Sequence, residues 1–171
     1  MNQKGYTLIE ILISLLILAL IFGIGFIGYR EFSKRQALAA VVRNINADLR
    51  LTQELAFAGT KPTAGCSVLN GYTFKADVVA FPLTFFKQYS ISPNCSPAYG
   101  GPSTKTVVLP DGFYILPVPL WAQAFTFKTI GEGTTIPSGS TATVRIYQES
   151  SGWWWTWPIT DITVSSEGVI R

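Results

Sequence analysis

The stretch "QKGYTLIEILISLLILALIFGIGFIG", residues 3–28, decides how the chain begins to fold. From Ile11 to Gly28 its only polar side chain is Ser14. At about 1.5 Å per residue, a helix from Leu8 to Gly28 is about 30 Å long, which is the thickness of a bilayer core. The stretch therefore predicts a helix that crosses a membrane once. No small-residue cleavage site follows it in a polar context, so we expect the helix to stay with the mature protein.

A carboxylate, Glu10, lies near the start of this apolar run. An acidic side chain at the centre of a bilayer costs several kcal/mol, roughly 3 on insertion scales, and therefore indicates a function with a partner of opposite charge. The alternative is an interfacial side chain that reaches toward the lipid headgroups. Flanking charges do not decide the orientation, because Lys4 precedes the run while Lys34 and Arg35 follow it.

Beyond Tyr29 the helical pattern continues but becomes amphipathic. Apolar residues recur at spacings of three and four, which predicts one face packed on a body. Gly59 and Pro62 predict that the helix ends near Ala58. The residues of the apolar face are Leu38, Val41, Val42, Ile45, Leu49, Thr52, Leu55 and Ala56.

After residue 58 the chain consists of short β-favouring runs separated by Gly, Pro, Asn and Ser. We expect an α+β fold, in which a long N-terminal helix packs on an antiparallel β-sheet body at residues 59–171. "ATVRIYQ-ESSG-WWWTW" and "ITVS-SEG-VIR" are each typical of a hairpin. The predicted strands cover residues 67–74, 77–82, 85–91, 105–109, 113–116, 124–130, 141–148, 153–157 and 160–165.

Composition bounds the class of protein. Lys and Arg number 13 against 10 Asp and Glu, and charged residues make up only 13% of the 171-residue chain, about half the usual share. The basic residues are scattered, which gives little support for a nucleic-acid partner. The low charge and the many aromatic residues are expected of an exported β-rich body with a membrane segment.

Cys66 and Cys95 both lie beyond the apolar run. In a domain exported to an oxidising compartment such a pair is most simply a disulfide, and two free thiols are the alternative. The chain has no His, so Ser–His and Cys–His catalytic pairs are impossible, and the carboxylates of the body fall singly. We expect no enzyme, no cofactor and no metal site.

Four tryptophans stand close together at Trp153, Trp154, Trp155 and Trp157. In a strand, Trp154 would face one way and the other three the opposite way. They would form a stacking or adhesive platform for bases, glycans or another subunit, or else fill the core beneath the sheet.

The order Lys4-Gly5-Tyr6-Thr7-Leu8-Ile9-Glu10, followed by the long apolar helix, resembles the class III signal of type IV pilins and of the pseudopilins of type II secretion systems. The resemblance implies that residues 1–5 are a leader, that a prepilin peptidase cuts between Gly5 and Tyr6 and methylates the new amine of Tyr6, and that Glu10 guides assembly. It also implies that residues 6–28 form the transmembrane and assembly helix and residues 29–58 its amphipathic continuation.

Physical reasoning agrees with this assignment. Gly5 has no side chain, so its backbone can lie extended in a protease cleft at little steric cost. Cleavage leaves an ammonium on Tyr6, one helical turn from Glu10. Glu10 can pair with that amine or with the amine of a neighbouring subunit in a filament, where a misaligned register would leave a charge unpaired.

The helix end "NADLRLTQELAFAGTKP" and the terminal "SEGVIR" resemble GspH/FimT-type minor pilins. Some pilins of this type bind DNA through arginines that follow the glycine of the last turn. Here Val169 and Ile170 stand between Gly168 and Arg171, so one of those arginines is absent.

The resemblance implies a structural subunit, a minor pilin or pseudopilin, of a type IV pilus or type II secretion-like filament. Its expected partners are the prepilin peptidase, other pilin or pseudopilin subunits, an inner-membrane assembly platform and membrane lipid. We expect a single-pass protein of the cytoplasmic membrane with an extracytoplasmic C-terminal domain, which then enters a cell-surface or periplasmic filament. The alternatives are a DNA-uptake or adhesive tip pilin that uses the tryptophans and Arg171, and an anchored ectodomain that never polymerises.

Overall fold

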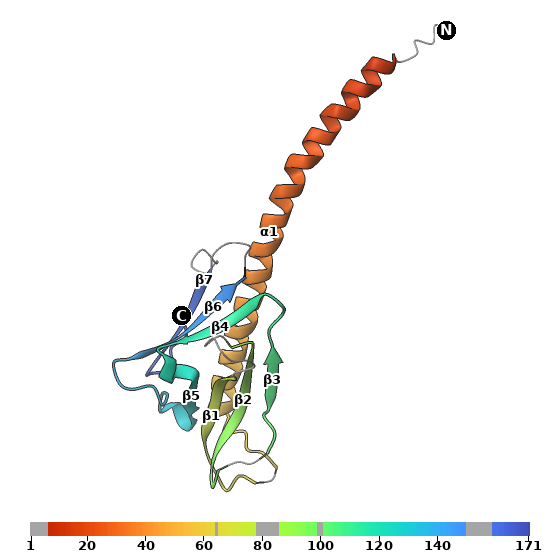
Figure 1. The fold of residues 1–171 in the computed structure, drawn as a ribbon. Coiled ribbons are helices and arrows are strands. Elements are labelled where there is room, and N and C mark those ends of the chain that lie inside the picture. The colour runs from red at the N-terminus through yellow and green to blue at the C-terminus, as the bar shows by residue number, and fades with distance from the viewer. Residues whose placement is uncertain (1–6, 64, 78–85, 99–100, 150–158) are drawn as a thin grey trace. The chain divides into compact units, whose positions relative to one another are not determined.

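The computed structural model describes residues 7–63, 65–77, 86–98, 101–149 and 159–171, without the side chains of residues 24–28, 30 and 31. The chain divides into two compact units, Met1–Ala39 and Ala40–Arg171. One helix, α1 (Leu8–Phe57), contributes its first part to the first unit and its second part to the second (Figure 1). The predicted helix from residue 6 to residue 58 is thus confirmed over the described residues.

The first unit is helical throughout its described part. Thr7 precedes α1, and its carbonyl accepts hydrogen bonds from the backbone N–H of Glu10 at 3.1 Å and of Ile11 at 3.3 Å. Among the residues whose side chains are described, no helical segment combines the length and the hydropathy needed to cross a membrane.

In the second unit, α1 buries the predicted apolar face. Val41, Ile45, Leu49 and Ala56 are all buried, as is Thr52. The helix ends as expected at Gly59, which has a φ of +60°. The N–H of Gly59 donates to the carbonyl of Ala56, and the N–H of Thr60 donates to the carbonyl of Leu55. This pair of bonds is a Schellman cap, which the positive φ of a glycine makes inexpensive.

Within the described residues, seven strands form two antiparallel sheets beside this part of the helix (Figure 1). The first sheet has the order β3-β2-β1-β5 and the second the order β4-β6-β7. Paired backbone hydrogen bonds between Phe86 and Ile115 join the two sheets. The elements are β1 (Val68–Asp77), β2 (Gln88–Ser96), β3 (Lys105–Val108), β4 (Phe113–Val118), η1 (Leu120–Gln123), β5 (Ala124–Lys128), η2 (Thr129–Gly131), β6 (Thr141–Gln148) and β7 (Ile159–Ser165).

Seven of the nine predicted strands match observed ones. Most of the predicted strand 77–82 and all of 153–157 lie outside the described residues. The predicted hairpin between residues 142–148 and the tryptophan segment is wrong, because both edges of β6 are already paired, one with β4 and the other with β7. The terminal hairpin is confirmed, because Thr163 and Arg171 exchange both backbone hydrogen bonds across the Gly168 turn.

The aromatic core of the first sheet follows from its period-two pattern. Phe74 of β1 stacks on Tyr89 of β2 with ring centroids 5.1 Å apart and on Phe125 of β5 at 5.6 Å. Phe125 meets Phe127 edge to face at 5.7 Å. Alternate residues of these strands face one side, so one hydrophobic layer forms under the sheet.

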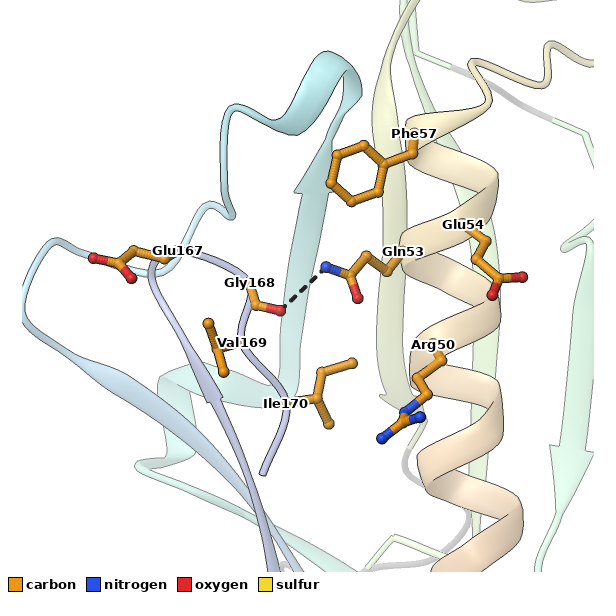
Figure 2. A pocket seen from close by; sticks show the side chains of 8 residues that line it. All are labelled: Arg50, Gln53, Glu54, Phe57, Glu167, Gly168, Val169 and Ile170. Atoms are coloured by element: carbon orange, nitrogen blue, oxygen red, sulfur yellow. Dashed lines mark hydrogen bonds between the residues drawn. The ribbon is translucent and has the colours of Figure 1, made fainter.

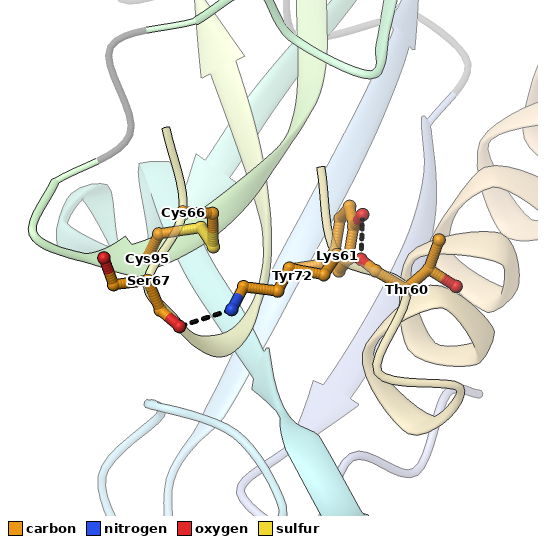
Figure 3. The surroundings of a disulfide bond; sticks show 6 residues. All are labelled: Thr60, Lys61, Cys66, Ser67, Tyr72 and Cys95. Carbon is orange, nitrogen blue, oxygen red and sulfur yellow. Dashed lines mark hydrogen bonds between the residues drawn. A yellow bond between two sulfur atoms is a disulfide. The ribbon is translucent and has the colours of Figure 1, made fainter. Parts of the chain in front are cut away.

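Cys66 and Cys95 form a disulfide with a Cα–Cα distance of 5.4 Å, which confirms the predicted pairing over the two free thiols (Figure 3). It joins the segment that follows the helix to β2. The same segment is held by the Tyr72 hydroxyl, which donates to the carbonyl of Thr60 at 2.7 Å, and by the Lys61 ammonium, which donates to the carbonyl of Ser67.

Replacing both cysteines (Cys66→Ser with Cys95→Ser) should lower the free energy of unfolding by about 2 to 4 kcal/mol, because the bridge closes a loop of 29 residues in the unfolded chain. Denaturant unfolding of the full chain in detergent measures this loss. Adding a reductant should destabilise the wild type and leave the double variant unchanged. Equal stability of the two proteins under oxidising conditions would contradict the prediction.

Candidate functional site

The exposed apolar end of α1 is the first candidate site. Glu10 lies in the first turn of the helix and is exposed. Its carbonyl accepts a hydrogen bond from the Ser14 hydroxyl at 2.8 Å, and its N–H also faces the Thr7 hydroxyl at 3.4 Å. A carboxylate in the first turn is favoured by the positive end of the helix dipole. Gly5 and Tyr6, the predicted processing residues, lie outside the described residues.

The large apolar side chains around Glu10 have no cover within the described part of the chain. From Leu8 to Phe22 they are between 49% and 81% exposed. Leu15 and Leu18 line a shallow hollow of about 230 Å³ together with Glu10, Ile11 and Ser14. A helix that is apolar on all sides needs an apolar surrounding, either lipid or other protein.

A second cluster joins the helix to the first sheet through a buried carboxylate, Asp48, which is only 6% exposed. Its Oδ2 accepts a hydrogen bond from the Tyr89 hydroxyl at 2.7 Å, and its Oδ1 lies 2.6 Å from the Lys105 ammonium. Burial and the bond to Asp48 raise the pKa of Tyr89 well above its usual value. This cluster was not predicted, although an Asp beside Leu49 and one turn before Thr52 on the apolar face was a signal.

Removing the carboxylate (Asp48→Ala) should lower the free energy of unfolding by about 1 to 3 kcal/mol, because the buried Tyr89 hydroxyl loses its acceptor. Asp48→Asn should cost less, since an amide oxygen can still accept that bond. The exposed ion pair between Arg145 and Asp161 is the matched control, and Asp161→Ala should cost at most about 1 kcal/mol. Denaturant unfolding measures all three, and an equal loss in Asp48→Ala and Asp161→Ala would refute the assignment.

The raised pKa of Tyr89 also predicts an alkaline instability. Above pH 10 the unfolded chain loses the Tyr89 proton while the folded chain keeps it, so stability falls as the pH rises, by at most about 1.4 kcal/mol per pH unit. Between pH 9.5 and pH 11.5 the Tyr89→Phe variant should show a shallower fall than the wild type. Parallel slopes in wild type and Tyr89→Phe would contradict this.

A third feature is a groove of about 460 Å³ between the last turns of α1 and the terminal hairpin. Figure 2 shows Arg50 and Gln53 directed from the helix toward the hairpin, while Glu54 points away from it. The Gln53 amide donates to the carbonyl of Gly168 at 3.3 Å. The lining residues are Arg50, Gln53, Glu54, Phe57, Glu167, Gly168, Val169 and Ile170.

Two glycines shape this corner of the second unit. Gly168 has a φ of +88°, which favours glycine at the turn. At Gly133 an added Cβ would lie 2.6 Å from the carbonyl oxygen of Ser166, so only glycine allows the loop after β5 to approach the terminal turn this closely.

Of the residues proposed for DNA or surface binding, the structure describes only Arg171. Arg171 is exposed and forms no ion pair with the described residues. Trp153, Trp154, Trp155 and Trp157 lie outside them. DNA or adhesive binding therefore stays a prediction. Over the described ranges, no group of three or more His, Cys, Asp or Glu could hold a metal ion.

Comparison with known proteins bears on the N-terminal segment. Residues 1–26 match the family model of the prokaryotic N-terminal methylation motif. No curated protein and no solved structure matches the chain significantly. The match supports the type IV pilin and pseudopilin family on its class III signal, and it does not extend to the GspH/FimT subtype.

Proposed function

We propose that this chain is a structural subunit, a minor pilin or pseudopilin, of a type IV pilus or type II secretion-like filament. The observation that carries the proposal is the methylation motif at residues 1–26, within which the large apolar side chains of the helix are exposed from Leu8 to Phe22. The pilin family is structural and non-enzymatic, and we propose the same for this chain.

In this proposal the prepilin peptidase removes residues 1–5 and methylates the amine of Tyr6. Cleavage creates a new positive charge, the ammonium of Tyr6, about one helical turn from Glu10. In an apolar filament core a carboxylate and an ammonium are both costly unless they meet, so their pairing selects the register of one subunit against the next. The pair acts on the specificity of assembly more than on the stability of a single subunit.

Before assembly, we propose that residues 6–28 hold the subunit in the cytoplasmic membrane, with the β body on the extracytoplasmic side. The printed sequence supports this, because Ser14 is the only polar residue between Ile11 and Gly28. On assembly, neighbouring subunits would replace the lipid around the apolar side chains of this helix. The assembly platform of the inner membrane would carry out this transfer.

Glu10→Gln in the full chain, expressed with the prepilin peptidase and the assembly machinery, tests the proposal. Cleavage after Gly5 and methylation of Tyr6 should persist, as measured by mass spectrometry of the N-terminal peptide. Incorporation into sheared filaments should fall by at least about tenfold, because an unpaired ammonium in an apolar core costs more than the 1.4 kcal/mol that a factor of ten represents.

Ser14→Ala is the matched control, because it lies one turn away and loses only its bond to the carbonyl of Glu10. It should assemble like the wild type. A wild-type chain that stays uncut and unmethylated in the presence of the peptidase would overturn the proposed function.

A further inference from the structure

Ile130, in the short η2 turn (Thr129–Gly131), has a conformation and an exposure that folding alone does not explain. Its φ is +60° and its ψ is +22°, in the left-handed region. A β-branched side chain is strongly disfavoured there, whereas Gly or Asn is accommodated readily. The side chain is also 87% exposed, so it contributes almost nothing to the core.

The surrounding turn holds Ile130 in this conformation. The N–H of Lys128 donates to the carbonyl of Gly133 at 2.9 Å, and the N–H of Glu132 faces the carbonyl of Thr129 at 3.4 Å. Gly131 then packs against the last turn of the helix, since an added Cβ would lie 2.9 Å from the Phe57 ring. The backbone of Ile130 is therefore strained, and its side chain is exposed to solvent.

Two further exposed apolar side chains lie at the same corner. Phe57 is 56% exposed and Val169 is 47% exposed. Phe57 lines the groove with Val169 and also lines a small neighbouring hollow with Gly131. We call Phe57, Ile130 and Val169 the corner patch. It joins the end of α1, the η2 turn and the terminal hairpin.

The polar residues beside the corner patch are more acidic than basic. Glu54, Glu132 and Glu167 are ion-paired with no group among the described residues, and Arg50 and Lys128 lie nearby. A partner surface that fits would combine exposed apolar side chains with an excess of positive charge.

The first unit of this chain carries such a surface at residues 29–35, "YREFSKR". Tyr29 and Phe32 are 69% and 60% exposed, and their spacing of three places them on one face of the helix. Three of the seven residues are basic and one is acidic. Arg35, three residues beyond Phe32, lies on the same side of the helix, is exposed and forms no ion pair within the described structure.

We propose that the corner patch docks on residues 29–35 of a second copy of this chain. The inference rests on the proposed function, because it names a contact between subunits of the filament. The corner patch and residues 29–35 are different surfaces. A copy that contacts its neighbour through one of them therefore keeps the other free for a third copy. Subunits can then be added one after another without the assembly closing into a ring. Apolar contact with Tyr29 and Phe32 would bury Ile130, which accounts for keeping an isoleucine at a strained position.

The first test places a photo-crosslinking phenylalanine analogue at position 130 of the full chain, and separately at position 169. We expect crosslinked dimers in assembled filaments, with mass spectrometry placing the second end of the crosslink within residues 29–35. Filaments whose crosslinks reach only other segments or other proteins, or that give no crosslink, would overturn the inference.

The second test uses Ile130→Asn, which suits the left-handed backbone and removes the apolar side chain. We expect the melting temperature of the full chain in detergent to rise by about 2 to 4 °C, through relief of strain. Incorporation into filaments should fall by at least about tenfold. Val108→Thr, at an exposed position of β3, is the matched control and should leave incorporation unchanged.

The outcomes separate the two proposals. If Ile130→Asn assembles like the wild type while Glu10→Gln does not, the contact inferred here is wrong and the proposed function stands. A lower melting temperature of Ile130→Asn would refute the strain argument on which the contact depends. A wild type that is neither cut after Gly5 nor assembled would refute the proposed function and the inferred contact together.

Discussion

The buried carboxylate of Asp48 is the interaction on which the second unit depends most directly. A carboxylate that is largely removed from water must keep its partners, and here they come from the centre and the edge of one sheet, Tyr89 on β2 and Lys105 on β3. A rotation of the helix by one residue, which is about 100°, would move the Asp48 carboxylate away from both Tyr89 and Lys105. The apolar face alone would tolerate small shifts of the helix along the sheet, whereas these two bonds select one position.

The two units differ in how completely their side chains are buried or hydrogen-bonded within the unit itself. In the second unit the aromatic layer is covered and the linker after the helix is held by the disulfide and by the bond from Tyr72 to Thr60. Within the described residues, Asn46 Oδ1 is the single buried side-chain polar atom that lacks a partner. In the first unit, the large apolar side chains from Leu8 to Phe22 are exposed. A folded body joined to a helix with uncovered apolar side chains is what the proposed function requires of a subunit that is first held in a membrane and then assembled.

Local signals predicted the local structure well. The helix ends at a glycine because a Schellman cap needs a residue with positive φ, and Gly59 stands at that position. The disulfide followed from composition and the expected compartment. The prediction failed to find the Asp48 cluster, because Asp48 and Lys105 are 57 residues apart and nothing near either residue indicates the other. Ile130 was also missed, since its neighbours indicated only a strand end and not a left-handed turn.

The sequence by itself determined the apolar N-terminal helix with Glu10, the class III signal, the amphipathic continuation and the presence of an antiparallel β body. These are read over a few helical turns or one strand, where side-chain periodicity and the special backbone of glycine act locally. Only the tertiary structure decided the order of the strands, the pairing of β6 with β4 and β7, the burial of Asp48 between helix and sheet, and the corner patch. Each of these brings together residues that are distant in sequence, and their contacts depend on the packing of the whole second unit.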